Sequence, residues 1–417
     1  MEKANSNPQD IVIIGAGFVG VATAMWLQKS GHKVTLIDPE PFEKGAYFGN
    51  ACTIATYANI PVGTPSTIKN IPKLLFSPQS PLSLSWSYLP KLTPWLLRFA
   101  WASRPSQVAS ISHQLGVLLS HAQSALAPLI ETAKGEDLVA KNGTLYLYGS
   151  EAGFMKAKSD IQLRRLSGIP VTKLTKAEIS DLEPQLNPVY KRGLFFDNAQ
   201  HLLSPLNLLQ RMGASVIAKG GQIITNKALG IERVDAHKLK VLLQGSSVLA
   251  DKVVVAAGAW SKDLARQAGD QLPLDTEQGY HLMYNAQQQL LQRPVGWADA
   301  GVYLTPMNDG LRAAGTVELA GLNNPINPRR LEIISGAVND LLPQLKNYDS
   351  QWTGFRPSMP DSKPVIGRSS KDGGIFYAFG HGHIGVTLSG ITGKLISELI
   401  DNKAPSVDIS AFAPGRF

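Results

Sequence analysis

Three glycines near the beginning of the chain have the types and spacing of a phosphate-binding loop. The segment reads Gly15, Ala16, Gly17, Phe18, Val19 and Gly20. In such a loop the first glycine permits a tight turn, and the second lets a pyrophosphate approach the backbone. The third lets the following helix pack closely on the preceding strand. The pattern predicts a dinucleotide site whose phosphates meet free N–H groups at a helix N-terminus.

An acidic residue stands where the ribose of such a dinucleotide would lie. Asp38 ends the next apolar segment and is followed by Pro39. Its carboxylate can accept hydrogen bonds from both ribose hydroxyls of an adenosine, whereas it would repel a 2′-phosphate. NADP is therefore unfavourable here. FAD and NAD both remain open at this point, as does a glycine-rich turn that matches the pattern by chance.

The elements that must position this loop are a strand, a helix and a second strand. Residues 10–14 form an apolar run typical of a buried parallel strand. Residues 19–30 read as a helix, with Gly31 at the position where a helix ends in the left-handed conformation. Residues 33–37 read as the next strand. One βαβ unit therefore opens the chain.

The remainder of the chain predicts a mixed α/β fold with two domains. Prolines break residues 55–105 into short pieces, which argues against a strand-rich core there. Further helices are expected over 112–133, 151–167 and 205–219. Strands are expected over 143–148, 170–174, 193–196, 222–225, 230–235, 238–243, 252–257, 280–285, 302–307 and 311–316. A strand over 375–379 and a helix over 386–400 form a second β–loop–α unit near the C-terminus.

The two βαβ-like ends suggest a Rossmann-type domain built from separated segments, with an antiparallel-sheet domain inserted between them. We place the dinucleotide-binding domain in residues 1–60, 202–270 and 350–417. The substrate-binding domain then takes residues 61–201 and 271–349. The fold class is therefore α/β, in the α+β sense of a parallel and an antiparallel sheet in one chain.

Composition excludes several other classes of protein. The chain has 417 residues, of which 44% are apolar, as in ordinary globular proteins of two joined domains. A single cysteine, Cys52, excludes an internal disulfide framework and a thiolate metal cluster, and we expect no metal site. The net charge of +8 favours anionic partners such as a nucleotide, a carboxylate or a phospholipid surface. No dense run of Lys and Arg points to nucleic acid.

The beginning of the chain is polar and leads directly into the first strand. It lacks the basic start, apolar stretch and cleavage site of a secretory signal. No window approaches the roughly 20 uninterrupted apolar residues of a membrane-spanning helix. We expect a cytoplasmic protein.

Residues 85–104 combine aromatic and basic side chains. The aromatic residues are Trp86, Tyr88, Trp95, Phe99 and Trp101, and the basic residues are Lys91, Arg98 and Arg104. This mixture suits peripheral contact with a bilayer surface. We expect the segment either to contact the inner face of the cell membrane or to cover the core of the substrate-binding domain.

Four further segments carry recognisable motifs. They read Gly-Ala-Tyr-Phe-Gly-Asn-Ala (45–51), Val-Val-Val-Ala-Ala-Gly-Ala-Trp-Ser (253–261), Gly-Phe-Arg-Pro-Ser-Met-Pro-Asp with Pro-Val-Ile-Gly (354–367), and Gly-His-Gly-His-Ile-Gly (380–385). In this order, over nearly the whole chain, they resemble the D-amino-acid oxidase-like family of FAD-dependent oxidoreductases. Within it they are most similar to a bacterial branch of D-amino-acid dehydrogenases and D-hydroxyproline dehydrogenases. Two departures are Cys52, where glycine is usual, and Gln278-Gly279-Tyr280-His281, where Arg-Gly-Tyr is usual.

The resemblance implies a non-covalently bound FAD and names the residues beside it. The implied contacts are Gly15, Ala16, Gly17, Phe18, Val19, Gly20, Asp38, Pro39, Asn50, Ala51, Ala257, Gly258, Trp260, Gly380, His381, Gly382, His383, Ile384 and Gly385. Backbone N–H groups in the last segment can stabilise negative charge on the reduced flavin.

The resemblance also assigns three residues to the catalytic site. Arg356 matches the arginine that grips the substrate carboxylate, and a guanidinium suits such a bidentate contact. Neighbours on a strand point to opposite faces, so only one of Tyr280 and His281 is expected to enter the pocket. The resemblance favours Tyr280, because related enzymes place a hydroxyl on the pocket wall there. His383 is expected to contact the substrate. The alternatives are a structural arginine, a packed core tyrosine, and histidines that only shape the loop. No general base is evident.

The implied reaction is a dehydrogenation of a D-amino acid or of a cyclic imino acid such as D-hydroxyproline. A hydride passes from Cα to flavin N5, an imine and then a 2-oxo acid result, and the electrons go to a quinone or another non-oxygen acceptor. An oxidase of glycine- or sarcosine-like amines, a flavin monooxygenase and a non-catalytic subunit are the alternatives. Arg312 and Glu318 are expected to be structural, at the domain interface or paired with each other.

Overall fold

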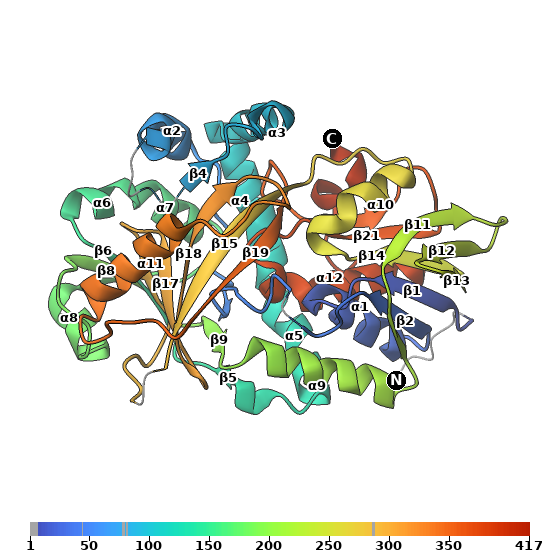
Figure 1. Cartoon of the computed structure of the whole chain (residues 1–417), viewed down its shortest axis with the longest axis horizontal. Helices are drawn as coiled ribbons and strands as arrows, with labels where there is room; N and C mark the ends of the chain where they lie inside the picture. The colour runs from blue at the N-terminus through green and yellow to red at the C-terminus, as the bar shows by residue number, and fades with distance from the viewer. Residues whose placement is uncertain (1–6, 44, 77–79, 81, 286–287) are drawn as a thin grey trace.

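The computed structural model describes residues 7–43, 45–76, 80, 82–285 and 288–417. The predicted domain ranges 1–60, 61–201 and 271–349 also contain residues 1–6, 44, 77–79, 81 and 286–287, which lie outside the described residues. The molecule has two large sheets side by side, each with its own helices, and two small three-stranded sheets (Figure 1). The predicted combination of a parallel and an antiparallel sheet is confirmed.

The parallel sheet has six strands. Their order is β10 (Gln222–Thr225), β2 (Lys33–Asp38), β1 (Asp10–Ile14), β14 (Lys252–Val255), β21 (Ile375–Phe379) and β20 (Val365–Arg368), with only β20 antiparallel to its neighbour. Side chains of β1 alternate between two cores: Ile11 and Ile13 enter one, and Val12 and Ile14 enter the other. Burial on both faces explains why this strand reads as a continuous apolar run.

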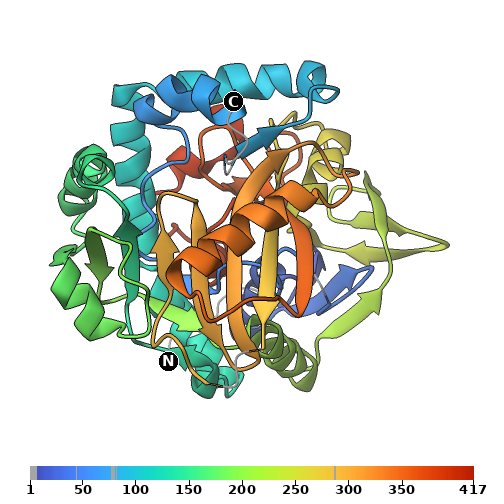
Figure 2. The same ribbon diagram turned by 60° about the vertical axis from the view of Figure 1, so that its left-hand side comes forward.

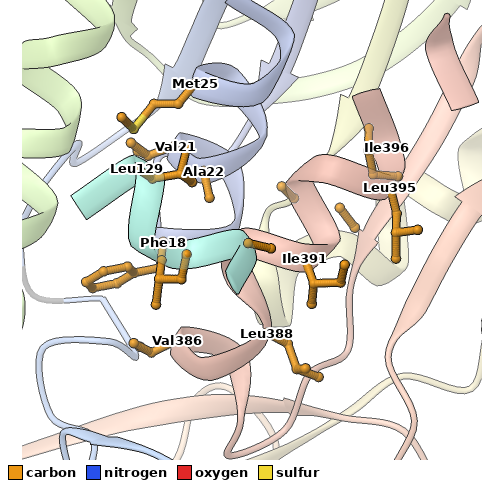
Figure 3. Close-up of a cluster of buried hydrophobic side chains, with 14 of the residues drawn as sticks. Phe18, Val21, Ala22, Met25, Leu129, Val386, Leu388, Ile391, Leu395 and Ile396 are labelled. Carbon is orange, nitrogen blue, oxygen red and sulfur yellow. The ribbon is translucent and has the colours of Figure 1, made fainter. Parts of the chain in front are cut away.

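Helices cover one face of the parallel sheet. They are α1 (Phe18–Lys29), α4 (Pro105–Ser120), α5 (Ala122–Thr132), α9 (Pro205–Ala218) and α12 (Gly385–Ile400). Figure 3 shows Phe18 and Met25 of α1, Leu129 of α5 and Ile391 of α12 in this core. The helices α4 and α5, inside the predicted substrate-binding range 61–201, thus share the core of the parallel sheet. The predicted substrate-binding range 61–201 should therefore not include α4 and α5. The other domain boundaries stay a proposal.

A small antiparallel sheet and a short helix cover the other face. The sheet consists of β11 (Ala228–Arg233), β12 (Leu239–Leu243) and β13 (Ser246–Ala250), and the helix is α10 (Ser261–Gln267). Leu239 and Val241 of β12 pack there with Val253 of β14. The parallel sheet is therefore enclosed on both sides, and its carboxyl edge remains as the place for a ligand.

The larger sheet has nine strands. Eight follow the order β19 (Ser350–Ser358), β15 (Asp275–Tyr284), β18 (Gly310–Leu319), β17 (Val302–Met307), β16 (Val295–Trp297), β6 (Thr144–Tyr148), β8 (Arg192–Phe196) and β7 (Thr172–Thr175), and β4 (Leu82–Leu84) pairs with β18. Helix α11 (Pro328–Leu341) lies across one face (Figure 2), where Ile334 and Val338 pack against Leu282. The opposite face turns toward the parallel-sheet domain.

The remaining elements connect the two sheets or cover their edges. They are α2 (Pro65–Phe76), α3 (Leu89–Ala102), α6 (Glu151–Lys156), α7 (Lys158–Leu166), α8 (Lys176–Leu182), and the strands β3 (Thr53–Ile54), β5 (Val139–Ala140) and β9 (Gln200–Leu202). The strands predicted over 222–225 and 375–379 are confirmed to the residue. Helix α11 and strand β19, which carries Arg356, escaped prediction.

Candidate active site

The glycine loop between β1 and α1 is built so tightly that two of its glycines tolerate no side chain. Gly15 has φ of 112°, and a Cβ there would lie 2.4 Å from the carbonyl oxygen of Ala256. A Cβ on Gly20 would lie 1.9 Å from the carbonyl oxygen of Gly15. Gly17 precedes α1, whose first turn holds no acidic residue and no side-chain cap. The first N–H groups of α1 are therefore left for an anion.

Asp38 lies at the edge of this loop. Its Oδ2 accepts a hydrogen bond from the backbone N–H of Ala16 at 2.8 Å, and its Oδ1 accepts one from Glu40 at 2.9 Å. The carboxylate is thus held beside the loop where a ribose would follow the phosphates. The loop and Asp38 together fit the adenosine and pyrophosphate portions of a dinucleotide.

The other segments predicted to contact the cofactor converge on the same edge of the parallel sheet. Residues 257–260 follow β14 and residues 380–385 follow β21, so both leave the sheet at its carboxyl edge, as the glycine loop does. The carbonyl of Ala51 accepts a hydrogen bond from Thr305 on β17 at 2.8 Å. The segment around Asn50 and Ala51 is thereby tied to the larger sheet, between the two domains.

Arg356 lies flat on the face of the larger sheet that turns toward this edge. It is directly opposite Glu277 in the β15–β19 pairing. Its guanidinium crosses β15 above Gly279, where a Cβ would come within 2.5 Å of Arg356 Cζ. Nη1 donates to the carbonyl of Thr316 on β18 at 3.3 Å. Gly279 therefore makes the room that lets the charge lie on the sheet surface.

Tyr280 lies on the opposite face of the sheet from Arg356. Its hydroxyl donates to Glu318 at 2.6 Å, and its ring is buried in the core under α11. His281 instead lies on the Arg356 face, where its ring stacks on Trp352 at 5.3 Å between centroids. The prediction that Tyr280, rather than His281, faces the pocket is therefore wrong. Helix α11 covers the face of the sheet that carries Tyr280, so the other face borders the pocket. The alternation of residues along a strand does not show which face a helix covers.

Arg312 and Glu318 do not pair with each other. Arg312 Nη1 donates to the carbonyl of Phe48 at 2.6 Å and lies 3.1 Å from Cys52 Sγ. Arg312 therefore ties β18 to the segment beside the predicted flavin site, at the domain interface. Glu318 accepts the hydrogen bond from Tyr280 on the far face. Of the two expected arrangements, the interface role holds for Arg312.

The two histidines of the 380–385 loop have different surroundings. His381 is buried, and its Nε2 lies 2.9 Å from Thr392 Oγ1 in α12, so it helps to dock that helix. His383 is exposed and lines a cavity. Desolvation by the surrounding protein first, and the charge of Arg356 second, lower the pKa of His383 to about 4. His383 is therefore neutral near pH 7 and leaves anion binding to Arg356.

A buried carboxyl that sequence reasoning missed borders the same cavity. Glu277 is 8% exposed and lines the cavity with Ser358, His383 and the glycines at 380 and 382. Burial raises the pKa of Glu277, and Arg356 and the Ser358 hydroxyl oppose that rise. Glu277 stands next to the noted Gln-Gly-Tyr segment. Nothing in the residue type alone distinguished it from a solvated acid.

Residues 10–399 match the model of the DAO family, described as FAD dependent oxidoreductase. This chain belongs to that family. A D-amino-acid oxidase of Bradyrhizobium diazoefficiens is 36% identical over 419 residues, which cover 98% of each chain. A D-amino acid dehydrogenase of Vibrio vulnificus is 28% identical over 93% of this chain and 95% of the relative.

Solved structures show the same fold in this FAD-dependent oxidoreductase. Glycine oxidase from Geobacillus kaustophilus has a TM-score of 0.77 at 22% identity, over 99% of this chain and 100% of the other. L-proline dehydrogenase from P. horikoshii has a TM-score of 0.73 at 18% identity, over 99% and 98%. The predicted family, fold and FAD cofactor are thus confirmed. The non-covalent attachment of FAD and the residue-by-residue contacts stay predictions.

A further hydroxyl on the Arg356 face was also missed. In the sheet register of this oxidoreductase, His281 is opposite Ala314 and Ala314 is opposite Tyr303, so Tyr303 points to the same side as His281. The Tyr303 hydroxyl lies 3.5 Å from that of Tyr57. The predicted strand over 302–307 contained this residue, but the face it presents follows only from the pairing of three strands.

The arrangement separates two tasks. The glycine loop and Asp38 fit the adenosine end of FAD, and the N–H groups at the start of α12 suit the electron-accepting end. When bound, FAD supplies the hydride acceptor of the reaction. The larger sheet offers the cation Arg356 beside a neutral His383. Among the described residues, no group of three or more His, Cys, Asp or Glu side chains is arranged to hold a metal ion.

Proposed function

We propose that this oxidoreductase oxidises the C–N bond of a D-amino acid or of a cyclic imino acid such as D-hydroxyproline. The products are an imine, then a 2-oxo acid. The observation that carries the proposal is the Arg356 guanidinium, held on the sheet by Gly279 and the Thr316 carbonyl beside the 380–385 loop. The relatives named D-amino-acid oxidase and D-amino acid dehydrogenase support the substrate class.

In this proposal the chain's residues position the substrate. Arg356 binds the carboxylate with two parallel hydrogen bonds, which fixes the orientation of Cα. Tyr303 donates a further hydrogen bond from the same face of the sheet. His383, neutral near pH 7, forms part of the wall beside Arg356 without adding charge. Held in this way, the Cα–H bond can face the cofactor.

An anaerobic substrate screen tests the proposal. The FAD-loaded protein is mixed with D-, L- and N-methyl amino acids and with D-hydroxyproline, and the flavin absorbance is followed. We expect bleaching with D-amino or cyclic imino acids and a 2-oxo acid or cyclic imine as product. If no amino or imino acid bleaches the flavin while dithionite does, the proposal is wrong.

The electron acceptor distinguishes a dehydrogenase from an oxidase. We propose a quinone or another non-oxygen acceptor. The second candidate is an oxidase, because a relative at 36% identity is named D-amino-acid oxidase. Turnover of one substrate is measured with a soluble quinone and with air-saturated buffer. Faster turnover with the quinone supports the dehydrogenase, whereas stoichiometric hydrogen peroxide at an equal rate supports the oxidase.

Contact with a membrane surface would give access to a quinone, and α3 offers a surface for it. The helix lies at the periphery of the molecule (Figure 1). Leu97 and Trp101, one turn apart, are 68% and 51% exposed, and Trp86 just before the helix is 63% exposed. Basic side chains at Arg98 and Arg104 accompany them and suit anionic headgroups. Among the described residues, no helix has the length and apolar character needed to cross a bilayer.

Some aromatic residues of this segment are buried and others are exposed. Trp95 and Phe99 are buried and stacked at 5.2 Å, and they cover the core. Flotation with anionic liposomes tests whether the exposed residues of this segment contact a membrane. We expect the wild type to float and L97E/W101E to stay in the soluble fraction. The matched control is L166E, which changes a 74% exposed leucine on α7. A wild type that never floats would exclude this contact.

A further inference from the structure

The carboxyl of Glu277 is buried, and among the described residues it has no ion-pair partner within 4.0 Å. It faces Arg356 and Ser358 on β19 and His383 on the 380–385 loop. Arg356 does not form an ion pair with it within 4.0 Å, because the guanidinium is turned across Gly279 to the Thr316 carbonyl. A buried carboxyl in this position gains from a cationic partner. The cavity that it lines is where such a partner would enter.

The two charges of this face match the two charges of an amino acid. Glu277 and Arg356 are directly opposite on neighbouring antiparallel strands, which sets their Cβ atoms about 5 Å apart. Their charged ends diverge, because Arg356 extends over Gly279 while Glu277 borders the cavity with Ser358 and His383. A small zwitterion can therefore place its carboxylate on Arg356 and its ammonium on Glu277. A neutral His383 opposes neither contact.

We propose that Glu277 binds the ammonium group of the substrate and accepts a proton from it before the Cα–H bond breaks. This inference rests on the proposed function. An N–H bond of the substrate breaks and an O–H bond forms on Glu277, which leaves a neutral amine. The nitrogen lone pair then forms the C=N bond as the Cα–H bond breaks, and the hydride with its two electrons goes to FAD. Water hydrolyses the protonated imine, and Glu277 returns its proton to solvent.

Glu277 could bind the substrate ammonium, or it could serve only as a counter-ion for Arg356. A pair of ligands that cannot be oxidised distinguishes these two roles. The amino acid 2-aminoisobutyrate has no Cα–H bond, and 2,2-dimethylpropanoate has a methyl group in place of its ammonium. Binding of each to the FAD-loaded protein is measured by calorimetry. We expect Glu277→Gln to weaken the binding of 2-aminoisobutyrate at least about tenfold. The binding of 2,2-dimethylpropanoate should stay unchanged or become tighter. An equal change for both ligands would overturn the proposal.

The pH dependence of flavin bleaching gives a second readout. With a substrate that bleaches the wild type, Glu277→Gln should be slower by about 100-fold near neutral pH, the lower range of general-base effects. The deficit should shrink above the pKa of the substrate ammonium, because the amine then arrives neutral. Glu277→Asp should restore part of the neutral-pH rate. A deficit that stays constant with pH would contradict proton acceptance.

The matched control removes a buried carboxylate from the far face of the same sheet. Glu318→Gln leaves the cavity intact, since Glu318 contacts Tyr280 and Asn327 under α11. It should not change the preference between the two ligands. Failure of the inference is distinguishable from failure of the proposed function. In the first case amino acids bleach the wild type and Glu277→Gln equally, and in the second they bleach neither.

Discussion

The glycine loop and the Arg356 face are built in different ways. The loop is contained in one turn between β1 and α1, and it is closed by nearby segments such as Asp38 at the end of β2 and Ala256 just after β14. The Arg356 face depends on β19, β15 and β18 lying in register, so that Gly279 and Thr316 meet the guanidinium. The first site is therefore local and rigid, whereas the second exists only when distant segments of the chain are paired.

This difference separates holding the cofactor from choosing the substrate. A change in the loop should affect FAD binding and leave the sheet face intact. A change on the sheet face should affect the substrate and leave FAD in place. The four predictions below test that separation, first by effects on binding from the largest to the smallest and then by an effect on stability.

Arg356→Gln should abolish most substrate binding while the protein still purifies with FAD. The loss of a buried, charge-assisted contact should lower the second-order rate of flavin bleaching by about 1,000-fold. The control is Arg266→Gln on α10, where the arginine side chain is 69% exposed. Anaerobic stopped-flow measurements with the best substrate give this rate for each variant. A rate within a few fold of the wild type would remove Arg356 from the site.

Gly20→Ala should give the opposite result, with weakened FAD binding. The new Cβ would lie 1.9 Å from the carbonyl oxygen of Gly15, so α1 must move away from β1. We expect FAD binding to weaken by about 100-fold, as overpacking of this kind costs a few kcal/mol. Gly336→Ala on α11 is the matched control, because a Cβ there meets no atom within 4 Å. Equal FAD content in both variants would contradict the loop's role.

Tyr303→Phe and Tyr280→Phe sharpen the assignment of the two faces. Tyr303 lies on the Arg356 face, and removing its hydroxyl should raise the dissociation constant of a carboxylate ligand by about tenfold. Tyr280 donates to Glu318 under α11, and its loss should cost about 1 kcal/mol of stability without changing ligand binding. Ligand titration and thermal unfolding of both variants provide the measurement. The reverse pattern would mean that the substrate approaches the other face.

His281 on β15 contacts the Gly49 segment, and it should make the folded protein less stable in acid. Burial first, and Arg312 second, lower the pKa of His281 to about 3, and its Nδ1 lies 3.4 Å from the carbonyl of Gly49. Unfolded histidine has a pKa of about 6.5, so the unfolded state binds more protons between these values and stability falls as the pH falls through this window. His281→Phe should lose about 2–3 kcal/mol less than the wild type between about pH 7 and pH 4.

Denaturant unfolding at several pH values checks this expectation. His237→Phe is the control, because His237 lies in an exposed turn. An acid-induced loss in His281→Phe equal to that of the wild type would show that another group carries the sensitivity.

The same contrast explains what could be predicted from the amino-acid order. The glycine loop, Asp38 and the strands over 222–225 and 375–379 followed from local patterns, because their residues are close together in the chain. Tyr280 was misplaced because strand alternation gives two faces without telling which one α11 covers. Glu277 and Tyr303 were missed because their positions on the Arg356 face arise from cross-strand register. Such a register depends on long-range pairing, which short patterns do not specify.

The most direct test of the account is a crystal structure of the FAD-loaded protein with 2-aminoisobutyrate. The account predicts the ligand on the Arg356 face, with a carboxylate oxygen within about 3 Å of each of two guanidinium nitrogens. The pyrophosphate should lie against the loop from Gly15 to Gly20. A ligand carboxylate bound away from Arg356, with the guanidinium still held only by the Thr316 carbonyl, would contradict the account.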